Sequence, residues 1–276
     1  SGTMPQLSSE FVKALDQVSV IRQLAQVDVR GTDTDVAYIV NRMTAALIGE
    51  GAAYEDEDFT VSKVSFASYK SGVKTDVTEE ALQDTAYDVA NEVIQEHARS
   101  HGRLWEGFFA TGTGSSQPRG MFHSGAGYST TSCAAAGAPK TADLVNLAYA
   151  INPAYLPTAS WLMHSTTWAE IVKDSTNAKY VLNGESGNIL RDGAAALFLG
   201  RPVYLSEFAP TANTAGTRKV LFGDFKRAYR IVDRTTLNFT VDDVSQRSSG
   251  LIRYSSRMRC DAKPMDTTAV RALVTI

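Results

Sequence analysis

The order of helical and strand patterns along this sequence predicts an α+β fold. A helical pattern near the N-terminus gives way to alternating strand character from Phe59 to Tyr69, and one long amphipathic helix follows and ends at Phe109. Short helix and strand patterns then mix, and the C-terminal part alternates as strands. The strands on either side of the central segment are therefore expected to pair with each other.

The N-terminal part predicts two helices and an acidic loop. Between Ser8 and Gln26, apolar residues recur with a period close to 3.6, which is typical of an amphipathic helix. A polar break at residues 30–35 separates it from a weaker helical pattern at Val36–Ile48. The next loop lacks the ligand spacing of a calcium loop, so we expect a solvated acidic tip. Its four consecutive acids are Glu55, Asp56, Glu57 and Asp58.

The long helix has a clear start and an unusual length. Thr78 is followed by Glu79 and Glu80, which place negative charge in the first helical turn. Apolar side chains then follow one face as far as Phe109. About 30 residues at ~1.5 Å each give a rod about 45 Å long. Such a rod is longer than an ordinary globular domain needs.

Shorter elements fill the rest of the chain. The pattern predicts a helix at Thr141–Ile151, a buried strand at Trp161–His164 and another helix that starts near Ser165. Two apolar strand pieces are separated at residues 200–202, and strands continue from there to the C-terminus. No internal repeat or low-complexity tract is present.

The composition allows one large domain or two interleaved domains. The chain has 276 residues, of which 43% are hydrophobic and 21% charged, so it can bury a core. Its net charge of −3 argues against a protein whose main task is to bind nucleic acid through a basic surface. Apolar runs such as Ala194–Leu199 are far shorter than the roughly 20 residues that a membrane helix needs. We expect no membrane partner.

The cell interior is the expected compartment. The first 30 residues are polar and helical in pattern, unlike a signal peptide. Cys133 and Cys260 lie far apart in the sequence and are expected to be free thiols rather than a disulfide or a metal site. The chain starts at Ser1, which indicates either proteolytic trimming or a remnant of cloning.

Patterns that carry enzyme chemistry are weak. His97 and His101 lie on one face of the long helix, but no glutamate follows the first histidine and no third ligand is obvious. We expect a surface or partly packed pair and no metal. No G-x-S-x-G nucleophile elbow is present, so we expect no enzyme and no cofactor. A hydrolase with an unrecognised site among Ser, His and Asp residues is the alternative from a different class.

The glycine-rich stretch FFATGTGSSQPRGMF, residues 108–122, does not fit a phosphate loop. A phosphate loop lies between a strand and a following helix and carries a lysine, whereas here a helix comes first and no lysine follows. The pattern favours a helix end and a tight turn without a ligand. The residues expected to serve backbone geometry are Gly112, Gly114, Pro118 and Gly120.

Two blocks of opposite charge lie far apart in the sequence. Residues 50–96 carry 12 acidic and 3 basic side chains, and residues 218–259 carry 10 basic and 4 acidic ones. Opposite blocks on one chain permit head-to-tail contacts between copies. Lys63 lies on the expected extended loop. The basic candidates for contacts between subunits are Arg227, Arg230 and Arg234.

Four motifs in order resemble the major capsid protein of tailed double-stranded-DNA bacteriophages, whose shell-subunit fold is shared with encapsulins and the herpesvirus capsid floor. KTDVTEEALQD resembles the entry to the family's spine helix, and GTGSSQPRG resembles its G-x-G-x-x-Q-P-x-G turn. SWLMHSTTWAEIVKDSTNAKYVL followed by ALFLGRPVYLSEFAP resembles the axial-domain segment. VLFGDFKRAYRIVDR resembles the strand that returns to the peripheral domain. The resemblance covers about Phe59 to Ile276.

The resemblance implies a structural shell protein that assembles into hexamers and pentamers of an icosahedral capsid around packaged DNA. It implies an N-terminal arm at 1–35, an extended loop at 36–69, a peripheral domain at 70–137 and 222–276, and an axial domain at 138–221. Implied partners are further copies of the chain and a portal, scaffold or protease. The implied location is the virion capsid, assembled in the host cytoplasm.

Some family members cross-link subunits through a lysine on the extended loop, an asparagine on the last strands and an assisting glutamate. Lys63 matches the lysine, but Gly250 and Arg257 stand where the other two would be placed, so no covalent cross-link is expected. An encapsulin-type shell, whose inner helix Ser8–Gln26 resembles, and a gene-transfer-agent capsid are the related alternatives. The Q-P-R-G turn and the G-D-F-K-R segment favour the phage capsid.

Overall fold

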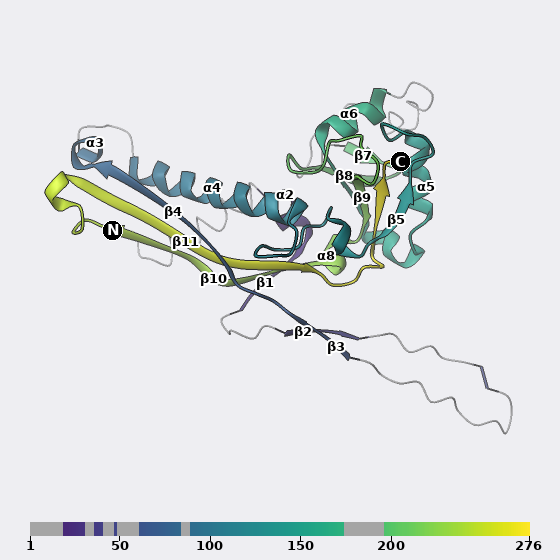
Figure 1. Cartoon of the computed structure of the whole chain (residues 1–276), viewed down its shortest axis with the longest axis horizontal. Helices are drawn as coiled ribbons and strands as arrows, with labels where there is room; N and C mark the ends of the chain where they lie inside the picture. Colours follow the sequence, from purple (N-terminus) through teal and green to yellow (C-terminus); the bar gives the residue numbers. More distant parts are fainter. Residues whose placement is uncertain (1–18, 31–35, 41–46, 49–60, 84–88, 174–195) are drawn as a thin grey trace.

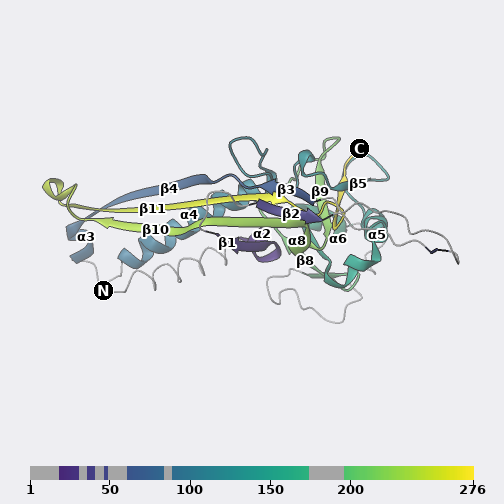
Figure 2. The same ribbon diagram turned by 90° about the horizontal axis from the view of Figure 1, so that it is seen from below.

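The computed structural model describes residues 19–30, 36–40, 47–48, 61–83, 89–173 and 196–276. The described part is elongated: a long sheet with a helix along one face occupies one end, and a second sheet with shorter helices occupies the other (Figures 1 and 2). A separate two-stranded ladder projects away from both sheets (Figure 1). The α+β class that the sequence predicts is confirmed.

The long sheet has four strands in the order β1-β10-β11-β4. Strands β10 (Tyr229–Asp242) and β11 (Leu251–Pro264) form an antiparallel hairpin of 14 residues each. Strand β4 (Tyr69–Thr78) pairs antiparallel with β11, and β1 (Gln26–Val29) pairs parallel with β10. The short helix η3 (Arg247–Ser249) closes the hairpin.

Helix α4 (Val89–Thr111) lies along one face of this sheet (Figure 1). Its buried face is apolar toward its C-terminus, where the rings of Trp105 and Phe109 stack 6.0 Å apart. The sequence predicts one rod of about 30 residues, but α4 has 23, about 35 Å at ~1.5 Å per residue. The expected start forms a separate helix, α3 (Glu79–Gln83), capped by the Thr78 hydroxyl. Residues 84–88 lie outside the described residues.

Two N-terminal predictions need correction. Helix α2 spans only Val20–Leu24, and the chain continues as strand β1 from Gln26, while residues 8–18 of the expected helix lie outside the described residues. The helix expected at Val36–Ile48 is wrong at its start, because β2 (Val36–Val40) is a strand that pairs with β3 (Val61–Ser65). Three of the five β2 residues are β-branched, and cross-strand pairing overrides a weak helical period.

The second sheet has six strands in the order β5-β12-β9-β6-β8-β7. Trp161 of β6 packs on Phe222 of β9, with ring centroids 4.0 Å apart. Helices α5 (Thr141–Tyr149) and α6 (Ser165–Lys173) start where the sequence predicts. The strands are β5 (Ser129–Ser132), β6 (Ser160–Met163), β7 (Ala196–Phe198), β8 (Arg201–Leu205), β9 (Arg218–Gly223) and β12 (Val270–Val274). The short helices are η1 (Ser124–Ala126), η2 (Pro153–Thr158) and α8 (Phe225–Ala228).

The sheets do not follow the domain boundaries expected from the sequence. Strands β5 and β12 fall within the ranges assigned to the peripheral domain, yet both belong to the six-stranded sheet. β12 lies between β5 and β9 because its Val270–Val274 backbone pairs with both strands. One apolar core continues through the junction, where Phe109 of α4 meets Tyr229 at the start of β10.

Candidate assembly surfaces

The glycine-rich turn closes the C-terminal end of α4. The Gly112 amide donates to the Phe108 carbonyl at 2.9 Å, and the Gly120 amide donates to the Gly112 carbonyl at 2.8 Å. A Cβ at Gly112 would lie 2.3 Å from the carbonyl oxygen of Pro118, which is itself buried. A Cβ at Gly120 would lie 2.5 Å from the Gly112 nitrogen. Neither glycine leaves room for a side chain.

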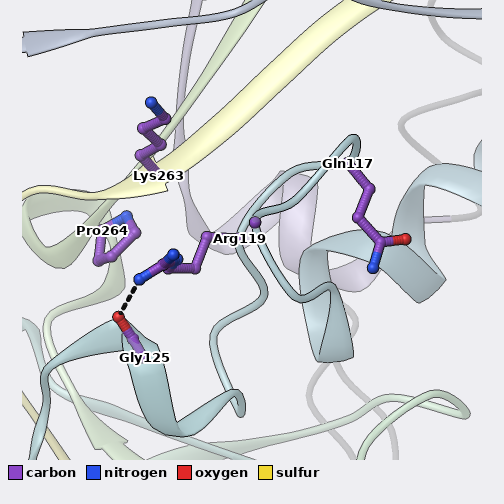
Figure 3. A pocket seen from close by; sticks show the side chains of 6 residues that line it. Gln117, Arg119, Gly125, Lys263 and Pro264 are labelled. Carbon is purple, nitrogen blue, oxygen red and sulfur yellow. Dashed lines mark hydrogen bonds between the residues drawn. The ribbon is translucent and has the colours of Figure 1, made fainter.

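A shallow hollow of about 290 Å³ lies beside this turn (Figure 3). The Arg119 guanidinium occupies the space beside Gly114, which has φ +78°, and donates to the Gly125 carbonyl at 2.8 Å. Lys263 points away from Arg119 and donates to the Ser65 carbonyl at 2.6 Å (Figure 3). The two cations do not converge on a common point in this hollow (Figure 3).

The structure describes some of the predicted contact residues and not others. Glu55, Asp56, Glu57 and Asp58 lie outside the described residues. Lys63 lies on β3 opposite Tyr38 of β2, and its side chain is also outside the described part.

The three basic candidates lie near the junction of the two sheets. Arg227 Nε lies 2.9 Å from the Asp266 carboxylate, and its guanidinium stands over the Tyr155 ring at 5.3 Å. Arg230 lies 3.4 Å from the Asp28 carboxylate and joins β10 to β1. Arg234 lies half-buried on β10. Arg227 and Arg230 thus have carboxylate partners within the chain.

A cationic cluster that was not predicted from the sequence lies on the face of the long sheet that α4 leaves uncovered. A hollow of about 310 Å³ there is lined by Lys70, Asn238, Arg257 and Arg259. On β11 these arginines alternate with the buried Met258 and Cys260. That alternation of basic and buried residues is visible in the sequence and could have identified the face.

The opposite face of the sheet is fixed to α4 through two buried histidines. His97 is 3% exposed and His101 is fully buried. Both rings contact the Ser256 hydroxyl of β11 at 2.9 Å. The sequence predicts a surface or partly packed pair, whereas both rings lie inside a polar layer between the helix and the sheet.

This layer continues to strand β4. The His97 ring contacts the Thr75 hydroxyl at 2.8 Å, and the His101 ring contacts the Ser71 hydroxyl at 2.8 Å. Trp105 can only donate, and it donates to Ser71 Oγ at 3.0 Å. Each group in this row can donate a hydrogen bond to the next one, starting from Trp105. Every ring nitrogen of His97 and His101 then has a partner while both histidines are neutral. Burial lowers the pKa of both rings, that of His101 to about 4, and His97 lowers the pKa of His101 further.

A buried carboxylate holds α2 against α4. Glu106 accepts the Ile21 amide and the Ser19 hydroxyl of the α2 start, and the Ser206 hydroxyl that follows β8 at 2.9 Å. Burial raises the pKa of Glu106, and these hydrogen bonds oppose the rise. The buried pair of Arg22 and Asp233 fixes α2 to β10. The start of the described chain is therefore tied to both sheets.

The comparisons with known proteins agree with this architecture. The family model described as "Phage capsid family" matches residues 2–275.

The chain belongs to the phage capsid family.

Solved structures of capsids share the fold. The capsid of a native GTA particle covers 92% of this chain and 89% of its own, with a TM-score of 0.77 and 20% identity. The protein of Mycobacterium phage Adephagia covers 93% and 89%, with a TM-score of 0.65 and 12% identity. The capsid of Myoviridae phage XM1 covers 94% and 92%, with a TM-score of 0.64 and 14% identity. None of the curated proteins compared matches the chain.

This phage capsid protein is a structural shell protein of the virion capsid, as the sequence predicts. Among the described residues, no helix is both long and apolar enough to span a membrane. The same residues hold no group of three or more metal-ligating side chains.

Proposed function

We propose that this chain assembles into hexamers and pentamers of an icosahedral shell that encloses double-stranded DNA and has no enzymatic activity. We further propose assembly in the host cytoplasm, with a portal, a scaffold or a protease as partners. In this proposal residues 1–35 form the N-terminal arm and 36–69 the extended loop. The peripheral domain comprises residues 70–137 and 222–276 without strands β5 and β12. Those two strands belong to the six-stranded sheet, which we assign to the axial domain together with residues 138–221.

The β2–β3 ladder supports this proposal best. Among the described strands its two members pair only with each other, and the ladder projects from both sheets (Figure 1). Only its base is anchored there, where Val64 packs against Phe66 and Val232. A two-stranded hairpin alone is marginally stable in water at best, and three strands or a packing surface are normally needed. In this proposal the ladder lies on a neighbouring copy, which supplies such a packing surface.

Charge complementarity supports a head-to-tail contact. We propose that the acidic run Glu55–Asp58, with Lys63 at its base, meets the basic surface around Arg227, Arg230 and Arg234 of a neighbour. Arg227 is the most accessible ion-paired member, because its side chain is 48% exposed and only its Nε binds Asp266. Arg230 is less available, since its side chain is 24% exposed and bound to Asp28.

Reversing the charge at Arg227 tests this contact. Arg227→Glu is expected to lower the yield of assembled particles at about 0.1 M salt, and the wild type is expected to lose yield as salt rises and screens the contact. Arg99→Glu is the matched control, because Arg99 is 47% exposed and lies outside the basic block. Light scattering gives the yield. Equal assembly of Arg227→Glu and wild type, with no salt dependence, would rule the contact out.

A GTA-type capsid is the second candidate, favoured by the TM-score of 0.77 to the GTA particle. Negative-stain electron microscopy of the expressed chain tests the shell proposal for both. Closed shells or rings of subunits are expected, and the particle diameter would fix the number of copies. A uniform monomer that turns over a hydrolase substrate would overturn the proposal.

A further inference from the structure

The hollow on the uncovered face of the long sheet concentrates positive charge on three adjacent strands. Lys70 of β4 lies directly opposite Arg259 of β11 in the strand register. Arg257 lies two residues along β11, opposite Asn238 of β10. All four side chains are exposed and line one space of about 310 Å³.

These cations lack a counter-charge within the described part of the chain. No ion pair there includes Lys70, Arg257 or Arg259, although like charges opposite each other on neighbouring strands are destabilising. Asp76 and Asp261 lie on the same face but are occupied. Neither carboxylate could neutralise the cations of the hollow without losing its present hydrogen-bond partners.

The occupied acids flank the hollow at both ends. Asp76 binds the Arg253 guanidinium through both carboxylate oxygens, at 2.7 and 2.9 Å. Asp261 is buried and accepts the Ala67 amide at 2.6 Å and the Ala262 amide at 2.8 Å. Neither acid is therefore free to neutralise the positive charge between them.

The hollow also has room and suitable donors. Gly72 lies beside Arg257 in the register and has no side chain to fill the space, and a Cβ there would meet only the Ser256 carbonyl, at 3.5 Å. The Asn238 Oδ1 already accepts the Thr240 hydroxyl at 3.2 Å, which leaves its amide N–H groups as donors. Every free group at the hollow is therefore a donor.

We propose that this hollow binds an oxyanion, a phosphate or a carboxylate. Arg257 and Arg259 provide planar donor pairs that match two oxygens at once, and Lys70 adds a point charge. The oxyanion is either a free phosphate ion or a carboxylate side chain of a neighbouring copy. The site itself does not depend on shell assembly, so it can be tested on the unassembled chain.

Calorimetric titration of the unassembled full chain with inorganic phosphate, at constant ionic strength, tests the site. The wild type is expected to show saturable binding, and the double variant Arg257→Gln/Arg259→Gln is expected to bind about tenfold more weakly or worse. Arg253→Gln is the control, because Arg253 lies on the same face of β11 but is bound to Asp76. Unchanged circular dichroism and melting of the variants would show that folding is intact.

Phosphate binding to the assembled particle distinguishes a free phosphate ion from a carboxylate of a neighbouring copy. Equal phosphate binding before and after assembly indicates a free ion. Phosphate binding that is lost on assembly indicates that a neighbouring copy fills the hollow. Either result supports the site. No saturable binding to the unassembled wild type, or an equal loss in Arg253→Gln, would overturn it.

Discussion

Gly120→Ala is expected to destabilise the protein strongly, because the glycine-rich turn has no room for the added methyl group. Its Cβ would lie 2.5 Å from the Gly112 nitrogen and 2.6 Å from both the Ala110 oxygen and the Thr111 nitrogen. All three are backbone atoms at the end of α4, so no side-chain rotation relieves the overlap. Such overpacking costs about 3 kcal/mol. The melting temperature should fall by roughly 6–12 °C.

Gly72→Ala is the control for this prediction. It adds the same methyl group to strand β4, where the new Cβ would meet the Ser256 carbonyl oxygen at 3.5 Å. Its melting temperature should lie within a few degrees of wild type. Thermal melting followed by circular dichroism compares the two variants. If Gly120→Ala and Gly72→Ala had the same melting temperature, the turn would accommodate the added methyl group without loss of stability, which would contradict the prediction.

Acid is expected to weaken the joint between α4 and the long sheet through His101. The pKa of His101 is lowered from 6.5 to about 4 by burial, with His97 lowering it further and a Ser256 hydrogen bond opposing. A folded pKa below the unfolded one gives stability that is complete above about pH 6.5 and is lost as the pH falls toward 4. A shift of this size corresponds to about 3 kcal/mol. His97 adds to the effect, since burial lowers its pKa while Glu96 opposes the shift.

Melting temperatures between pH 7 and pH 4 test this prediction. The wild type should lose stability steeply over that range, while His101→Gln should show a flatter profile after an initial loss at pH 7. His164→Gln is the control, because within the described part of the chain the His164 ring hydrogen-bonds to Thr166 of its own turn. If His101→Gln kept the wild-type slope, the acid sensitivity would come from other groups.

The parts of the fold predicted well from sequence are those with strong local patterns. The helices that start at Thr141 and Ser165 and the strand near Trp161 follow their apolar periods. β2 was not predicted because five residues are too few to show a clear strand pattern, and its strand conformation depends on pairing with β3. The place of β12 between β5 and β9 depends on contacts distant in sequence, which no local pattern encodes.

The candidate surfaces show the same limit. Charge counts identified the basic block, but they could not tell which arginines are already paired. Arg227 and Arg230 have partners distant in sequence, Asp266 and Asp28, whereas Arg257 and Arg259 have no ion pair among the described residues. That difference is set by the register of three strands and by the missing side chain at Gly72.

The most direct test of the central claim is the particle mass in solution. It compares the wild type with a variant in which residues 41–60, which connect β2 to β3, are replaced by a short Gly-Ser linker. The account predicts that the wild type forms particles of many 29.8 kDa chains and that the variant remains small but folded. A variant that assembles like the wild type, or a wild type that stays a single chain, would contradict it.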